Sequence, residues 1–303
     1  MRLKTSRSLA RLFLGLLLLA GCFTPTDALR DAAGEAIHRG AAFLASAQNP
    51  DGGFGMAPGE ASGYHATVWS LWALGAAGQG GTVRTSAAFD YVAATVPRFG
   101  PGADGVDSTA NNLSLAILAA VAHRRDPRHL EGIDLVARLR EEQDPATGHV
   151  GTLWNEHLFG MHALAAAHEA NGLEAAAGLL EAAVREEGFA VLGRDRWYAA
   201  EAVVALAEAG RTVLALEGAA ALAEELDGRG GLAPWEGAHP DASTTAAALR
   251  AFDAADGTDA ALTAGAFLLR QLDAQDGHAR FREGVEFMPV KTTAEVILAL
   301  RGL

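Results

Sequence analysis

Apolar residues recur with helical spacing along most of the chain, and the runs break at Gly, Pro, Asn and Asp. No segment alternates with the two-residue period of a strand. No linker rich in Pro, Ser or Gly divides the chain, so a single all-α domain over residues 32–303 is predicted. Twelve helices are expected, near residues 29–48, 62–78, 83–96, 107–124, 128–143, 153–170, 173–187, 196–209, 212–227, 241–255, 258–274 and 290–302.

These predicted helices are of two alternating kinds. The first, third and later odd members carry charges on one side, as in "LEAAAGLLEAAVREE" (173–187), which indicates one face in water. The even members are nearly uncharged, as in "TANNLSLAILAAVA" (109–122), which indicates burial on all sides. Alternation with a period of roughly 40–50 residues is typical of repeats built from helix pairs.

Six such pairs close most simply into an (α/α)6 toroid, with six inner helices inside six outer ones. An open solenoid also explains pairs, but its terminal repeats carry polar caps. The last predicted helix, "TTAEVILALRGL" (292–303), is as apolar as the internal ones. The pattern therefore favours the closed ring.

A turn motif recurs in phase with the pairs. It is "RGAAFLASAQNPDGGFG" at 39–55, with partial copies at 132–151, 218–235 and 265–281. The motif resembles the QW repeat of the squalene-cyclase and protein-prenyltransferase superfamily, which implies the same toroid. Gln48, Gln143 and Gln275 take the glutamine position, where an amide at a helix end satisfies free backbone groups. We expect these three side chains to act as staples between repeats.

The N-terminus has the features of a bacterial lipoprotein signal. Four basic residues precede the apolar run "LFLGLLLLA", which ends in "LAGC" at Cys22. This resembles a lipobox and predicts a signal peptide over 1–21, lipidation of Cys22 and a tether over 22–31. An ordinary secretory signal ending near a cysteine is the alternative. The protein is expected to be exported and lipid-anchored in the cell membrane or the outer membrane.

Composition narrows the chemistry. Cys22 is the only cysteine, so the domain is predicted to have no disulfide and no cysteine metal ligand. The formal charge is −13, which argues against nucleic acid as a partner and against binding of anionic headgroups through the body of the protein. We expect no metal and no cofactor. The membrane is the expected partner through the N-terminal lipid.

Polar and aromatic residues gather at the predicted starts of the inner helices. On a toroid these starts open on one mouth, where they would line a central cavity suited to a hydrophobic ligand, a carbohydrate or a partner protein. For Asp107, Ser108, Thr109 and Asp241, helix capping is the competing interpretation. The cavity candidates are Tyr64, His65, Trp69, Asn111, Asn112, Trp154, Asn155, His157, His162, Trp197, Tyr198 and Trp235.

The resemblance implies specific catalytic sets, and the sequence departs from each of them. Triterpene cyclases of the superfamily use a DxDDTA motif as general acid, and the matching stretch is "DASTTA" at 241–246. Asp241 matches its first position, but Ser243 takes the place of the catalytic acid, and an alcohol does not protonate an alkene. The zinc sites of the prenyltransferases need a cysteine that the domain lacks.

Two classes of function remain. One is a non-catalytic toroid that binds a ligand or partner in the cell envelope. The other is an enzyme of another type, a glycan hydrolase or lyase or a terpenoid-related enzyme, which uses inner-helix carboxylates. Glycoside hydrolysis needs a pair of them at a cleft, and the candidates are Glu156, Glu201 and Asp241.

Overall fold

The computed structural model describes residues 25–96, 109–193 and 195–303. The predicted signal peptide, Cys22 and the predicted caps Asp107 and Ser108 lie outside these ranges. Within them the chain forms twelve α-helices and isolated β-bridges but no strand. Six helices are inner: α3 (Tyr64–Ala76), α5 (Thr109–Ala122), α7 (Trp154–Ala166), α9 (Arg196–Glu208), α11 (Ala242–Ala254) and α13 (Pro289–Leu300). Six are outer: α2 (Pro25–Ser46), α4 (Thr85–Thr95), α6 (Leu135–Glu141), α8 (Ala170–Glu187), α10 (Thr212–Glu224) and α12 (Thr258–Gln271).

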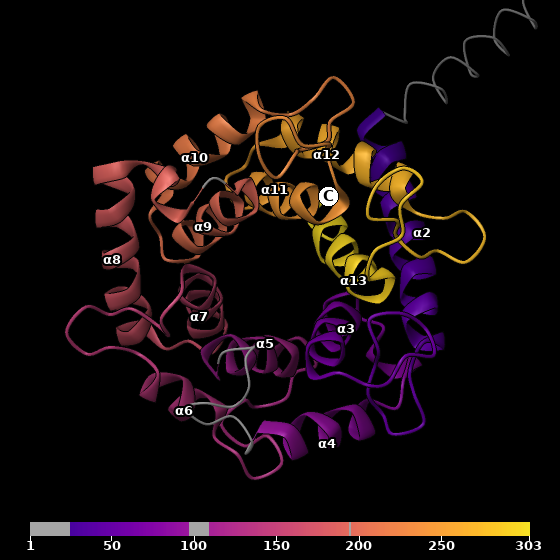
Figure 1. The fold of residues 1–303 in the computed structure, drawn as a ribbon, viewed down its shortest axis with the longest axis horizontal. Helices are drawn as coiled ribbons and strands as arrows, with labels where there is room; N and C mark the ends of the chain where they lie inside the picture. The colour runs from indigo at the N-terminus through magenta and orange to yellow at the C-terminus, as the bar shows by residue number, and fades with distance from the viewer. Residues whose placement is uncertain (1–24, 97–108, 194) are drawn as a thin grey trace, which may run out of the picture.

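The inner helices form a closed ring. Each packs on the next along the chain, and α13 packs back on α3 (Figure 1). The outer helices pack on the inner ring, and most of them contact two neighbouring inner helices. α2 lies mainly on α13, so the first helix covers the last. The predicted α/α toroid is confirmed.

Inner and outer helices differ in how much of their surface is buried. The inner helix α5 is buried from Ala110 to Ala120 without interruption, as its uncharged sequence predicts. The outer helix α8 buries Ala176, Ala177, Leu180 and Val184, which share one face at helical spacing. The core therefore lies between the two rings and within the inner ring.

Turn glycines fix the spacing between repeats. Gly52, Gly148, Gly230 and Gly277 all have positive φ, between 79° and 94°. Each also lies against the backbone of an outer helix in the next repeat, so that an added Cβ would come within 2.4–2.6 Å of a backbone atom. For Gly277 this neighbour is Arg39 of α2, which closes the outer ring.

A second contact repeats after these turns. The backbone N–H that follows the turn donates to a side chain in the first turns of the inner helix. Thr67 accepts from Phe54, Thr245 from Leu232 and Thr293 from Ala279, at 2.7–2.9 Å. In α7 the same place is taken by His157, whose Nδ1 accepts from Val150 at 3.1 Å.

The structure differs from the sequence predictions in three places. Residues 25–31 of the predicted tether are helical, because they belong to α2. α6 begins only at Leu135, because Glu131 and Gly132 turn the chain with positive φ and Asp134 caps the helix. Gln275 is not a staple: its side chain is exposed in the turn, and the bridge that Gln143 forms with Val150 is formed there by Leu272 with Ala279.

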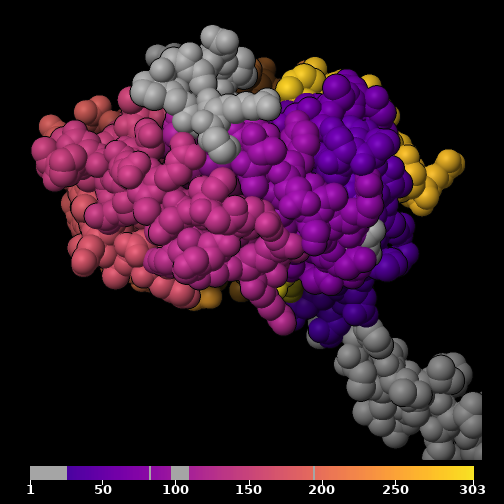
Figure 2. Space-filling model, turned by 90° about the horizontal axis from the view of Figure 1, so that it is seen from below, coloured from indigo at the N-terminus to yellow at the C-terminus, as the bar shows by residue number. Residues whose placement is uncertain are grey.

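Seen from the side, the body is a thick disc (Figure 2). The inner helices start at one face and end at the other. α2 runs opposite to them, and Arg30 near its start donates to the carbonyl of Leu303 at 2.6 Å. The start of α2 and the ends of the inner helices therefore share one face. No helix in the described ranges combines the length and apolar character of a membrane span.

Candidate functional site

Aromatic side chains fill the middle of the inner ring. Phe159 of α7 contacts Trp69 of α3 and Trp197 of α9, with ring centroids 5.7 and 5.8 Å apart. Trp72 packs on Trp69 with tilted rings, their centroids 5.2 Å apart. Beside Trp69 and Trp197 a void of about 10 Å³ remains, which is room for about one water molecule. The predicted ligand therefore does not fit among these residues in the middle of the ring.

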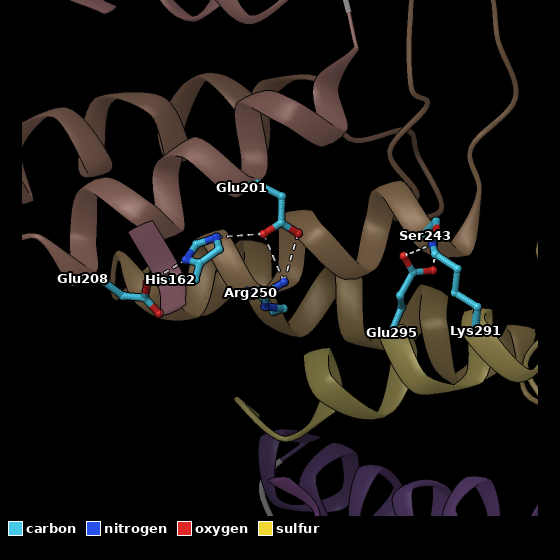
Figure 3. Close-up of polar contacts among 7 residues, drawn as sticks. All are labelled: His162, Glu201, Glu208, Ser243, Arg250, Lys291 and Glu295. Atoms are coloured by element: carbon cyan, nitrogen blue, oxygen red, sulfur yellow. Dashed lines mark hydrogen bonds and ion pairs between the residues drawn. The ribbon is translucent and has the colours of Figure 1, made fainter. Parts of the chain in front are cut away.

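A chain of four charged side chains crosses this apolar interior (Figure 3). Arg250 of α11 binds both carboxylate oxygens of Glu201 on α9, at 2.9 and 3.1 Å. His162 of α7 lies between Glu201, 3.1 Å from its Nε2, and Glu208, 2.6 Å from its Nδ1. Burial lowers the pKa of His162, but the two carboxylates outweigh it and raise this pKa to about 9. With His162 protonated, the four charges balance.

A second polar cluster lies across the void (Figure 3). The hydroxyl of Ser243 on α11 donates to Glu295 of α13, and Lys291 Nζ donates to the same carboxylate at 2.5 Å. Lys291 also lies 5.2 Å from the centroid of the Trp69 ring. Glu201, Arg250, Ser243 and Glu295 all line the void, so the two clusters form one polar line through the ring.

The other two predicted carboxylates act as helix caps. Glu156 accepts from the backbone N–H groups of Thr152 and Leu153 at 2.5 and 3.2 Å, before the first turn of α7. Asp241 caps α11 by accepting from Thr244 N at 2.7 Å. Burial raises the pKa of Asp241, and Glu295 and Asp195 add to this, giving about 6 despite the bonds from Thr244.

Several predicted cavity residues have structural contacts instead. Tyr64 donates from its hydroxyl to the carbonyl of Asn112 at 2.9 Å, which ties α3 to α5. His157 replaces a threonine in the repeated turn contact, and burial and His149 lower its pKa to about 3. Trp154 packs on His157, at 5.5 Å between ring centroids. Asn111 is buried, and Asn155 is half-buried at the start of α7.

His65 and Trp235 have different surroundings. His65 Nε2 accepts from Trp69 Nε1 at 3.1 Å, and burial and Lys291 lower the pKa of His65 to about 4. Trp235 lies away from the centre, with 54% of its surface exposed, in a groove of about 820 Å³. Tyr198 is half-buried and packs on Trp197, with centroids 5.2 Å apart.

The sequence analysis missed Glu208, Arg250, Lys291 and Glu295. The sequence did contain a signal for these residues, because each is a charged residue in an inner helix that is otherwise almost uncharged. Lys291 and Glu295 are also four residues apart, which places them on one helix face. In the described ranges, no three His, Cys, Asp or Glu side chains come together in a way that could hold a metal ion.

Comparison with known proteins gives structural neighbours only. No family model and no curated protein matches the sequence. A type II terpene cyclase variant from Scytonema, with its substrate geranylgeranyl dihydroxybenzoate, superposes with a TM-score of 0.67 at 17% identity, over 90% of this chain and 97% of that one. A glycosidase variant with glucose gives 0.56 at 17% identity, over 92% and 98%. A protein from Actinoplanes gives 0.56 at 20% identity, over 89% and 99%. At identities this low, the superpositions show the fold alone, a terpene-cyclase-like and glycosidase-like toroid.

Proposed function

We propose that this chain is a lipid-anchored protein of the cell envelope whose toroid binds a ligand or a partner without catalysing a reaction. The anchor is proposed from the basic, apolar and Leu-Ala-Gly-Cys sequence that ends at Cys22. One structural neighbour was solved with geranylgeranyl dihydroxybenzoate and another with glucose. These two ligands support a hydrophobic molecule or a carbohydrate as the proposed ligand.

The observation that carries the proposal is the environment of Ser243. The resemblance to cyclases puts the catalytic acid at this position, where this chain has a hydroxyl that donates to Glu295. Glu295 is itself bound by Lys291. Both contacts engage the one carboxylate next to the position of the missing acid, so its oxygens already have partners within this chain. Glu156 and Glu201 are also engaged, in a helix cap and in ion pairs.

An enzyme remains the alternative because of Asp241. Its pKa of about 6 keeps part of this carboxyl protonated near neutral pH, as a general acid requires. Its cap contact with Thr244 explains its position without catalysis.

Native mass spectrometry of the chain from residue 23, purified gently from its own host, tests the binding function. A co-purifying small molecule or protein supports it. Turnover of an envelope lipid or glycan that is lost in Asp241→Asn and kept in Glu208→Gln would overturn it. The anchor is tested separately, by the mass of the N-terminal peptide and by release of Cys22→Ser from the membrane fraction.

A further inference from the structure

A pit opens at the face where the inner helices end. It has a volume of about 530 Å³, within the usual range for small-molecule sites. Trp72, Leu118 and Val121 give it apolar walls, small residues at the ends of α3, α5 and α7 widen it, and Arg124 and Arg301 add charge. It lies on the opposite side from the predicted mouth.

The guanidinium groups of Arg124 and Arg301 are available to bind a ligand. Neither guanidinium has a hydrogen-bond or ion-pair partner among the described residues, whereas the adjacent Arg125 pairs with Glu131 at 3.1 Å. The described lining contains no acidic residue. On the same face Glu208 is bound to His162. Asp253 lies beside Gly302, the residue after Arg301, and does not line the pit.

The backbone at Arg124 is unfavourable for an arginine. Five inner helices end in a left-handed residue, which is glycine at Gly78 and Gly210 but Arg124, with φ of 57°, in α5. A side chain in this conformation is energetically unfavourable, a cost that glycine avoids. His168 ends α7 in the same way, also with φ of 57°, but does not line the pit.

Attraction to the helix end is the competing explanation for a cation here. The end of α5 is already capped, however, because Arg125 N donates to the carbonyl of Ala120 at 2.9 Å. The cap needs only the left-handed backbone and not the guanidinium.

We propose that the pit binds an amphiphile with one anionic head, a phosphate or a carboxylate. The guanidiniums of Arg124 and Arg301 hold the head, since arginine forms strong charge-assisted bonds with such groups. The apolar chain lies against Trp72, Leu118 and Val121. A single bound molecule needs only this local charge, so the acidic surface of the whole protein does not prevent it. The inference deepens the proposed ligand-binding function and rests on it.

Calorimetry with three probes below their micelle-forming concentrations tests the ligand class. Octyl phosphate is expected to bind the chain from residue 23. Inorganic phosphate, which has the head without the chain, and octyl glucoside, which has the chain without the charge, are each expected to bind at least tenfold more weakly. The proposal is overturned if octyl phosphate does not bind. It is also overturned, as regards an anionic head, if octyl glucoside binds as tightly as octyl phosphate.

Matched variants test the location. Arg124→Gly is expected to fold at least as stably as the parent and to bind octyl phosphate at least tenfold more weakly, and Arg301→Gln to bind similarly weakly. His168→Gly makes the same backbone change outside the pit and is expected to bind normally. Equal binding by Arg124→Gly and His168→Gly would refute the site. In that case a ligand seen by native mass spectrometry would still support the proposed function, at another site.

Discussion

Arg250 and Glu201 form a two-point ion pair in the middle of the ring, with one guanidinium nitrogen 2.9 and 3.1 Å from the two carboxylate oxygens. Glu201 is 1% exposed and also bonds to His162. Removing one partner of such a pair leaves the other charge buried, which typically costs about 3–5 kcal/mol. Glu201→Gln is therefore expected to lower the free energy of unfolding by about this amount, measured by urea titration.

Glu208→Gln is the control for that variant. Glu208 also bonds to His162, but its side chain is 38% exposed, so water screens its charge. Its loss leaves His162 paired with Glu201 and leaves no buried carboxylate unpaired, so it is expected to cost less than the loss of Glu201. If the two variants lose the same free energy of unfolding, burial does not determine how strongly these ion pairs stabilise the protein.

His162 is expected to make stability fall at alkaline pH. Its pKa is raised from 6.5 to about 9 in the folded protein, so the folded state holds the proton more tightly than the unfolded state. The stabilisation is complete below pH 6.5 and is lost as the pH rises through 9. Urea midpoints between pH 6 and 10 measure this loss. His162→Gln should abolish the slope in that window, and an unchanged slope would assign it to other groups.

Asp241 is expected to change the stability of the protein at lower pH than His162 does. Burial and the neighbouring acids Glu295 and Asp195 raise its pKa from 3.8 to about 6. The folded state therefore binds more protons in this window, and the contribution of Asp241 to stability falls as the pH rises from about 4 to 6. Asp241→Asn keeps a good capping side chain but does not titrate. The parent-minus-variant difference in unfolding free energy should decline across this window, whereas a flat difference would contradict the shift.

Gly277→Ala tests the closure of the outer ring. An alanine there would have a left-handed backbone, at roughly 1–2 kcal/mol, and a Cβ 2.6 Å from the carbonyl carbon of Arg39. Overpacking adds about 1–3 kcal/mol. Gly284 also has positive φ, 72°, but has open space around it, so Gly284→Ala should show only the backbone cost. Thermal and urea unfolding compare the two, and equal destabilisation would exclude close packing as the cause.

The fold was predictable because it depends on pattern. Uncharged and amphipathic helices alternate over the whole described chain. An uncharged helix can be buried on all sides and lies in the inner ring, whereas an amphipathic helix keeps one face in water and lies in the outer ring. The shorter α6 was harder, because the residues before Asp134 keep helical spacing and only the turn at Glu131 and Gly132 interrupts it.

The site was less predictable because side-chain partners come from different helices. Glu156 and Glu201 are both acids in inner helices, yet one binds its own helix end and the other binds residues of α7 and α11. Nothing in the local sequence separates these roles. Gln275 shows the same limit on a smaller scale, since the turn "LDAQDG" offers a glutamine close to the expected position but not at it.

The packing of α13 on α3 also bears on how the molecule comes apart. An open array of helix pairs can fray from either end, one pair at a time, because each terminal pair has a single neighbour. In a ring every pair has two neighbours, so the loss of one pair exposes two apolar surfaces at once. Partial unfolding is thereby disfavoured, and the toroid should melt as one cooperative unit rather than by unzipping.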